Sequence, residues 1–335
     1  MDTLGFAAKG LVVFVTVVAT VGAVVVVLTR RARPRLPRVE VKPLNERFLA
    51  LGDAVRSAVL PPKEQRALAK QRAKEAKARA GGATRPRIFV LDFHGDLLAS
   101  NVVRLREELS AVIGAARPED EVVLRLESLG GSVAHYGLAA AQLARLKARK
   151  VRLVACVDRV AASGGYMMAC VADELVAAPF AIVGSIGVVA QVPNVHRLLK
   201  KHDVDYEEMT AGEFKRTVSV FAEITDKGRQ KFSEQLEETH GLFKAFVKSQ
   251  RPALDVERLA TGEYWLGQRA RELGLVDRLA TSDDYLLSRA EAADLFQLRY
   301  LPDEPWRQRL ATFGVELAER LALALLSRLR ALELR

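Results

Sequence analysis

Short apolar runs alternate with longer amphipathic segments along the middle of the chain. Residues 88–93, 121–126 and 151–157 are rich in apolar side chains, which predicts three buried strands. Residues 102–113 and 132–149 lie between these runs and carry apolar positions at helical spacing. Strands that alternate with helices in this way predict an α/β domain whose strands pair largely in parallel.

An uncharged apolar run at residues 10–28 stands apart from this pattern, after a short N-terminal tail at 1–9. A helix of about 20 apolar residues is long enough to cross a bilayer. Five arginines follow the run in place of an A-x-A-like cleavage site: Arg30, Arg31, Arg33, Arg35 and Arg38. We therefore expect a retained transmembrane helix and not a cleaved signal peptide. The positive-inside rule then places the bulk of the chain in the cytoplasm.

The rest of the chain divides into three further parts. Residues 29–85 are basic and contain several prolines, which predicts a juxtamembrane linker followed by a solvated or membrane-surface helix. Residues 86–300 form the expected folded domain, in which 226–251 predict a long amphipathic helix and 265–277 a shorter one. Residues 301–335 predict an arginine-rich amphipathic helix, which suits a membrane surface or a neighbouring element.

The composition narrows the partners that we expect. The formal net charge is +10, the sequence pI is near 9.7, and the excess of positive charge lies near the N-terminus. This distribution favours an anionic membrane over nucleic acid. Cys156 and Cys170 lie in predicted core elements without C-x-x-C spacing, so we expect buried thiols and no disulfide or zinc site. No metal or other cofactor is expected.

Ser163 lies at a predicted turn between the strand at 151–157 and an apolar segment that begins at Tyr166. Such a turn exposes a hydroxyl, and the start of the next helix supplies free N–H groups that stabilise an oxyanion. The surrounding residues approach the nucleophile pattern G-x-S-x-G, with Ala161 in place of the first glycine. The same residues also suit a serine that only caps the helix, so both interpretations are open on this stretch alone.

The paired glycines Gly130 and Gly131 lie between the second predicted strand and the next helix. Backbone N–H groups in such a loop bind a carbonyl oxygen or an extended peptide. No G-x-G-x-x-G or P-loop pattern accompanies them, which disfavours a nucleotide site.

Lysine and histidine are the two candidate types of general base. Lys215 would need its pKa lowered by about 3 units from about 10.4, at a cost on the order of 4 kcal/mol. Burial against Phe214, with Arg216 as a nearby like charge, would lower it in this way. Among the histidines, His135 is the best rival because it lies close to the paired glycines. The other histidines stand in no catalytic pattern: His94, His196, His202 and His240.

Four motifs occur in the order of a known family: Ser128-Leu129-Gly130-Gly131-Ser132, Ala162-Ser163-Gly164-Gly165-Tyr166, Val183-Gly184-Ser185-Ile186-Gly187-Val188 and Ala211-Gly212-Glu213-Phe214-Lys215-Arg216-Thr217. Together they resemble the signal peptide peptidase A family of membrane serine peptidases, and most closely its SohB-type members. The resemblance covers nearly the whole chain. It implies a ClpP/crotonase-like fold for residues 86–300, an N-terminal transmembrane helix and no cofactor.

The resemblance also implies a Ser/Lys dyad in which Ser163 is the nucleophile and Lys215 the general base. Gly164 and the Gly130-Gly131 loop resemble the groups that hold the oxyanion and the substrate backbone. The implied activity is that of a membrane-anchored serine endopeptidase. Such an enzyme forms an acyl-enzyme and would act on signal-peptide remnants or on membrane and misfolded proteins.

The resemblance bears on three further features of this chain. Ser185 is a candidate to orient the amine of Lys215 by a hydrogen bond. Leu129 stands where the family motif usually has proline, which makes the loop less rigid. The chain carries one copy of the domain and so resembles members that assemble into a homo-oligomeric ring or dome. In such assemblies Ser163 and Lys215 can meet across a subunit boundary.

Two other functions are compatible with this fold. Leu129 and the basic segments motivate a non-catalytic oligomeric membrane scaffold, whereas a crotonase-like acyl-CoA enzyme would bind coenzyme A and leave the Ser/Lys pair without a role. The expected partners are peptide or protein substrates, membrane lipid and further copies of the chain, but no nucleic acid. The expected location is the cell inner membrane. The arginines place the catalytic domain in the cytoplasm, whereas the family's name-giving members are associated with the outer face, so the side stays open.

Overall fold

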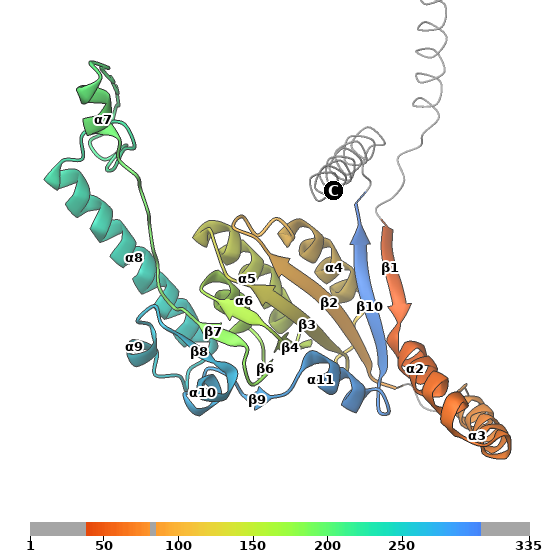
Figure 1. Ribbon diagram of the computed structural model, residues 1–335. Helices are drawn as coiled ribbons and strands as arrows, with labels where there is room; N and C mark the ends of the chain where they lie inside the picture. Colours follow the sequence, from red (N-terminus) through yellow and green to blue (C-terminus); the bar gives the residue numbers. More distant parts are fainter. Residues whose placement is uncertain (1–37, 81–84, 303–335) are drawn as a thin grey trace, which may run out of the picture. The chain divides into compact units, whose positions relative to one another are not determined.

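A largely parallel β-sheet forms the centre of the structure (Figure 1). The computed structural model describes residues 38–80 and 85–302, and Val39–Tyr300 make up one unit. The main strands lie in the order β1-β10-β2-β3-β4-β6-β9. Their bounds are β1 Arg38–Pro43, β2 Arg87–Gly95, β3 Glu121–Ser128, β4 Arg152–Val157, β6 Glu174–Ala177, β9 Arg278–Leu279 and β10 Asp294–Leu301. The pairs from β10 to β9 are parallel, which confirms the predicted α/β class.

Three short strands branch from this sheet: β5 (Val160–Ala162), β7 (Ile182–Gly184) and β8 (Tyr264–Leu266). β5 pairs in parallel with β3 and with β7, and β7 pairs antiparallel with β8. Trp265 is therefore a strand residue opposite Val183, and the helix predicted to begin there is wrong at its start. The pairing is a tertiary contact, which the local apolar pattern does not encode.

Side chains alternate between the two faces of the sheet along each strand, so each face carries apolar residues. Helices cover both faces. Their bounds are α2 Leu44–Val59, α3 Pro62–Ala80, α4 Val102–Ala115, α5 Val133–Ala148, α6 Gly164–Ala169, α7 His196–Lys201, α8 Asp226–Gln250, α9 Val256–Leu259, α10 Gly267–Glu272 and α11 Ser282–Arg289. On one face, Leu91 and Leu124 belong to a core that includes residues of α4, α5 and α6 (Figure 1). On the other face, Val90 and Val123 pack with α11 and the first residue of α2.

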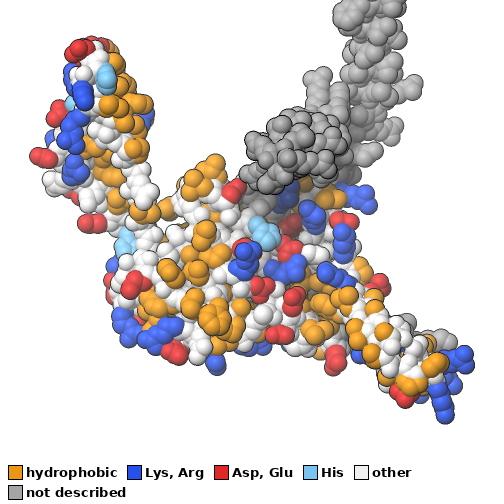
Figure 2. Space-filling view, in the orientation of Figure 1, with side chains coloured by type: hydrophobic (Ala, Val, Ile, Leu, Met, Phe, Trp, Pro, Cys, Tyr) orange, Lys and Arg blue, Asp and Glu red, His pale blue; other side chains and the backbone are white. Residues whose placement is uncertain are grey.

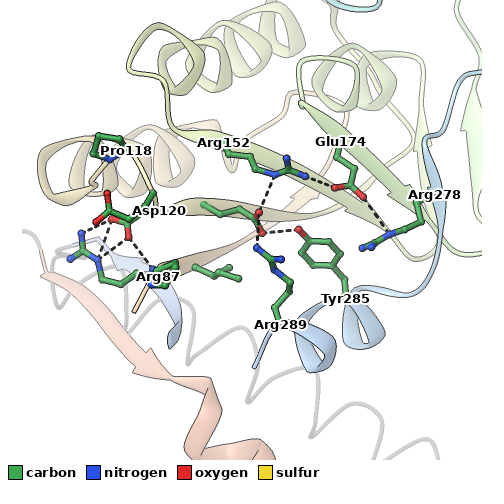
Figure 3. A pocket seen from close by; sticks show the side chains of 12 residues that line it. Arg87, Pro118, Asp120, Arg152, Glu174, Arg278, Tyr285 and Arg289 are labelled. Atoms are coloured by element: carbon green, nitrogen blue, oxygen red, sulfur yellow. Dashed lines mark hydrogen bonds and ion pairs between the residues drawn. The ribbon is translucent and has the colours of Figure 1, made fainter. Parts of the chain in front are cut away.

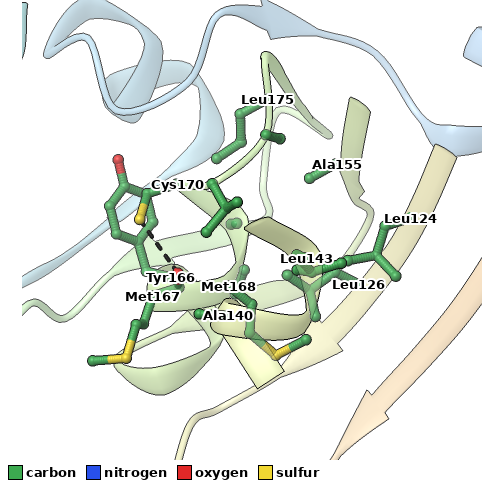
Figure 4. Packing of buried hydrophobic residues seen from close by; sticks show 14 of the residues in the cluster. Leu124, Leu126, Ala140, Leu143, Ala155, Tyr166, Met167, Met168, Cys170 and Leu175 are labelled. Atoms are coloured by element: carbon green, nitrogen blue, oxygen red, sulfur yellow. Dashed lines mark hydrogen bonds between the residues drawn. The ribbon is translucent and has the colours of Figure 1, made fainter. Parts of the chain in front are cut away.

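Helix α6 is buried along its whole length. Figure 4 shows Tyr166 and Met168 of α6 among side chains of the sheet and of α5, such as Leu126 and Leu143. Cys170 follows α6 directly, and it and Cys156 are buried and free. Burial raises the pKa of both thiols to about 12. The prediction of two buried thiols is therefore confirmed.

Residues 187–225 form an extension in which every residue is described and none is buried. We call this extension the arm; it contains α7 and lies along the first part of α8 (Figure 1). The N–H of Val195 donates to the carbonyl of Val220 at 2.8 Å and so closes the arm on itself. At the junction with α8, a Cβ on Gly228 would overlap the carbonyl oxygen of Thr217.

The segments at the two ends of the chain can be compared with their predictions only in part. The predicted transmembrane helix at 10–28 lies outside the described residues, and so does nearly all of the predicted helix at 301–335. Among the helices that the structure does describe, none has the length and apolar character needed to span a membrane. Residues 38–43, expected in a linker, form β1 beside β10.

Candidate active site

Ser163 forms the turn between β5 and α6, as the sequence predicts. Its backbone lies in the left-handed region, at a φ of 51°. The Ser163 N–H donates to the carbonyl of Gly184 at 2.8 Å, and its carbonyl accepts from the N–H of Met167 at 3.0 Å. These bonds hold a conformation that costs a non-glycine residue on the order of 1–3 kcal/mol. Ser163 is the N-cap residue of α6, but its side chain makes no capping hydrogen bond, so the helix does not engage its hydroxyl.

The paired glycines bring the β3–α5 loop against this turn. Gly130 has a φ of +89°, and a Cβ on it would lie 2.6 Å from the Gly164 nitrogen and 2.8 Å from Ser163 Cβ. A Cβ on Gly131 would overlap the carbonyl of Leu97. Only glycine therefore allows the loop to lie this close to Ser163.

The amides of the three glycines at the site differ in what they bind. The N–H of Gly130 donates to Ser128 Oγ at 3.0 Å and is thus used inside the loop. The N–H groups of Gly131 and Gly164 have no hydrogen-bond partner within the described part of the chain. Gly164 opens α6, and the first N–H groups of a helix lack intrahelical partners. Two amides beside Ser163 are therefore available to an oxyanion.

Ser185 lies next to Ser163 at the same edge of the sheet. The parallel register pairs Ala162 with Gly184, and Ser163 and Ser185 are the residues that follow this pair. Ser185 also has a φ of 51°, and its N–H donates to the carbonyl of Glu263 at 2.7 Å. The structure thus brings one predicted site residue, Ser185, into the neighbourhood of another.

Lys215 does not lie beside Ser163 within one copy of the chain. It is an exposed residue of the arm, and its side chain makes no ion pair or hydrogen bond with any residue that the structure describes. Its neighbour Phe214 contacts the first two turns of α8, since Lys227 Nζ and Lys231 Nζ lie 5.7 and 5.5 Å from the centre of its ring. Within one copy, Lys215 is therefore not buried against Phe214, whose ring is contacted by two lysines of α8 and is itself exposed.

The length of α8 separates this position from Ser163. Beyond Gly228, the buried residues of α8 are Phe243 and Val247, which belong to the same core as α6. The helix rises about 1.5 Å per residue, so the stretch from Lys231 to Phe243 spans about 18 Å. Figure 1 shows the arm beside the end of α8 that points away from α6. One copy of the chain therefore does not assemble the Ser/Lys pair.

The rival base His135 is engaged with a different serine. Its Nδ1 lies 2.8 Å from Ser132 Oγ, and the ring is exposed on the first turn of α5. No hydrogen bond joins His135 to Ser163 in the part of the chain that the structure describes. Two buried hydroxyls that the sequence interpretation left out, Ser128 and Tyr136, lie behind the glycine loop instead.

A cavity of about 310 Å³ lies at the opposite edge of the sheet, at the amino ends of its parallel strands. Figure 3 shows that its charged side chains pair with one another. Arg152 Nε lies 3.1 Å from Glu121 Oε2, and Arg278 Nε lies 3.3 Å from Glu174 Oε1. These ion pairs form a structural network along the cavity, which lies at the end of the sheet opposite Ser163.

The fold and the Ser163 turn define an α/β protein with a candidate serine nucleophile. A model described as Peptidase family S49 matches residues 145–296, and one described as Peptidase family S49 N-terminal matches residues 1–143. The probable protease SohB of Haemophilus influenzae is 48% identical over 87% of this chain and 86% of its own length. The probable protease SohB of Buchnera aphidicola subsp. Acyrthosiphon pisum is 54% identical over 64% of each chain.

The chain belongs to peptidase family S49. It is a peptidase, and the resemblance to the SohB-type members is confirmed. Among solved structures, a 1510-N membrane protease specific for a stomatin homolog from Pyrococcus horikoshii covers 62% of this chain and 79% of its own, with a TM-score of 0.38 and 11% identity. That score is too low to assign the fold, so the ClpP/crotonase-like assignment stays a prediction.

Proposed function

We propose that this protein is a serine endopeptidase in which Ser163 is the nucleophile and Lys215 the general base. Ser163 Oγ attacks the carbonyl carbon of a peptide bond while neutral Lys215 takes its proton. The oxyanion accepts hydrogen bonds from the N–H groups of Gly131 and Gly164. Lys215 then protonates the leaving amine, and water hydrolyses the acyl-enzyme with Lys215 again as base. The observation that carries this proposal is the Ser163 turn beside two unpaired amides in a chain of family S49.

The proposed site is completed by the arm of a second copy. Lys215 is exposed in one copy and makes no side-chain hydrogen bond or ion pair with the residues that the structure describes. The arm also exposes large apolar side chains, including Met209 at 90% and Val189 at 81% (Figure 2). Packing of this surface on a neighbour would bury it and would carry Lys215 out of water and into contact with Ser163. Ser185 would then hold the amine by a hydrogen bond.

The proposed substrate is an apolar, extended peptide segment at a membrane. Leu97, Leu98 and Leu129 are all more than half exposed. Leu129 precedes the glycines that contact Ser163, and the carbonyl of Leu97 accepts from the N–H of Ser132 at 2.8 Å. Such a rim suits signal-peptide remnants or segments of misfolded membrane proteins. Residues 10–28 would anchor the enzyme, and a reporter fused to the C-terminus would identify the side of the membrane.

Peptide hydrolysis by the detergent-solubilised full chain tests this proposal. We expect Ser163→Ala and Lys215→Ala to lose hydrolysis by a factor of at least about 10³, because each removes one reacting group. The matched controls are Ser249→Ala on the surface of α8 and Lys201→Ala on the arm, which should keep wild-type rates. Full activity in Ser163→Ala would contradict the proposal. An inactive but intact wild-type oligomer would favour the scaffold function.

A further inference from the structure

Two buried hydroxyl groups connect the glycine loop to the sheet behind it. Ser128 ends β3 and Tyr136 lies in the first turn of α5, so they stand on either side of the loop. The N–H of Gly130 donates to Ser128 Oγ at 3.0 Å, and Ser128 Oγ lies 2.5 Å from Tyr136 Oη. Tyr136 Oη in turn donates to the carbonyl of Asp96 at 2.8 Å.

The direction of this chain of hydrogen bonds follows from the number of hydrogens. The Asp96 carbonyl can only accept, so it takes the single hydroxyl hydrogen of Tyr136. Ser128 must therefore donate to Tyr136, and its oxygen is left to accept from the Gly130 N–H. Each hydroxyl donates once, and the chain runs in one direction from the loop to the β2–α4 turn.

Three glycines make room for these two side chains. A Cβ on Gly95 would overlap both Ser128 Oγ and Tyr136 Oη. A Cβ on Gly164 would overlap the ring of Tyr136, and a Cβ on Gly165 would lie 2.5 Å from the Ser128 carbonyl. The Tyr136 ring therefore packs directly on Gly164, the residue after the candidate nucleophile. Tyr136 thus contacts Gly164 directly and is connected through Ser128 to Gly130, the residue before Gly131.

We propose that Tyr136 and Ser128 are positioning residues, which hold the Gly131 and Gly164 amides in the geometry that binds the oxyanion. The inference rests on the proposed function, because it concerns the same site. The Gly130 N–H donates to Ser128 and therefore does not donate to the substrate. The same bond fixes the loop so that the amide of the next residue, Gly131, binds the oxyanion instead. Donors aimed in advance at a developing charge need no reorganisation during the reaction.

A merely structural role for the pair makes a different prediction. Buried, hydrogen-bonded hydroxyls stabilise a fold wherever they lie, and their loss lowers stability without a specific effect on turnover. Tyr285 is a suitable control, because it is also buried and its Oη donates to Glu121 Oε1 at 2.7 Å, at the opposite edge of the sheet. Tyr136→Phe and Tyr285→Phe each remove one buried hydroxyl and keep the ring.

Steady-state hydrolysis and inhibition by a peptide aldehyde separate the two roles. We expect Tyr136→Phe and Ser128→Ala each to lower kcat by roughly tenfold to hundredfold, with KM changed less than about twofold. The aldehyde adduct carries an oxyanion, so its affinity should fall by about the same factor as kcat/KM. Because the two hydroxyls act as one chain, the double variant should lose little more than either single variant.

The control variant and the wild-type assay distinguish failure of this inference from failure of the proposed function. Tyr285→Phe should lower the melting temperature as Tyr136→Phe does, but keep kcat within about twofold of the wild type. A folded Tyr136→Phe with wild-type kcat, or losses that multiply in the double variant, would overturn the inference while the proposed function stands. If Tyr136→Phe does not fold, Ser128→Ala must show the same loss of kcat for the inference to hold. A wild type without Ser163-dependent hydrolysis would overturn the proposed function itself.

Discussion

At the scale of single residues, the site depends on backbone conformations that side chains rarely adopt. Ser163 and Ser185 each have a φ of 51°, and Gly130 has a φ of +89°. The two serines follow paired residues of β5 and β7, and backbone bonds from Ser163 and Ser185 hold them in place. Strain of this kind is kept only where the surrounding structure enforces it, which is typical of functional turns.

Gly130→Ala tests whether the close approach of the loop matters for activity. The new Cβ would lie 2.6 Å from the Gly164 nitrogen, and alanine is strained at this φ. We expect kcat/KM for peptide hydrolysis to fall at least roughly a hundredfold, because a shift of about 1 Å in the loop displaces the Gly131 amide.

Gly137→Ala is the matched control for this substitution. Gly137 lies in α5, and a Cβ there meets nothing within 4 Å. Alanine should therefore stabilise the helix by up to about 1 kcal/mol and leave hydrolysis unchanged. Similar kinetics for the two variants would show that the loop does not need its observed position.

At the scale of elements, parallel register gathers the site at the carboxyl ends of the strands. Gly95 of β2 pairs with Ser128 of β3, and Ser128 pairs with Ala161 of β5. The short strand β7 then places Ser185 beside Ser163. A crevice at the carboxyl ends of parallel strands is the usual location of sites in α/β folds.

The sequence predicted three of the main strands, three of the long helices and the turn that holds Ser163, but not the eight-residue strand β10. Apolar runs identified β2, β3 and β4, and helical spacing identified α4, α5 and α8. The three-residue strands β5, β7 and β8 could not be predicted from the sequence. They are too short to show a periodic pattern, and they pair with residues far away in the chain. The hydrogen bond between Ser128 and Tyr136 could not be predicted either, because the two residues belong to different elements, β3 and α5. It depends on the space that Gly95 leaves on a neighbouring strand.

Glu108 links two elements in a way that makes stability depend on pH. It lies on α4, and its Oε1 accepts a hydrogen bond from the N–H of Tyr300 on β10 at 2.8 Å. Burial raises the pKa of this carboxyl from 4.5 to about 7. Between these values the unfolded chain is charged at Glu108 and the folded chain is neutral. The free energy of unfolding should therefore fall as the pH rises from about 4.5 to about 7.

Glu108→Gln should remove this contribution, because glutamine keeps the acceptor for Tyr300 and carries no charge. Relative to the wild type, we expect the variant to be more stable by on the order of 3 kcal/mol at pH 8 and about equally stable at pH 4. Denaturant unfolding at both values measures this, with Glu107→Gln, at the neighbouring half-buried glutamate that pairs with Arg106, as the control. A Glu108→Gln protein that is less stable than the wild type at pH 8 would contradict the assignment.

At the scale of the whole molecule, the two proposed reacting residues lie on different parts of one copy. Ser163 lies in the turn between β5 and α6, and Lys215 lies on the arm, next to Phe214, which contacts the first turns of α8. The family motifs identified both residues, but no sequence pattern shows which copy of the chain supplies each one. An exposed apolar arm that ends far from its own nucleophile supports the proposal that neighbouring copies exchange arms across a ring.

Activity of mixed oligomers tests this account most directly. Ser163→Ala and Lys215→Ala chains, carrying different affinity tags, are expressed together, and assemblies that contain both are isolated and assayed for peptide hydrolysis. If Ser163 and Lys215 of different copies form each site, random mixing leaves roughly one quarter of the sites with both residues intact. The account predicts about that share of wild-type activity, whereas each variant alone is inactive. Mixed assemblies no more active than either variant alone would contradict it.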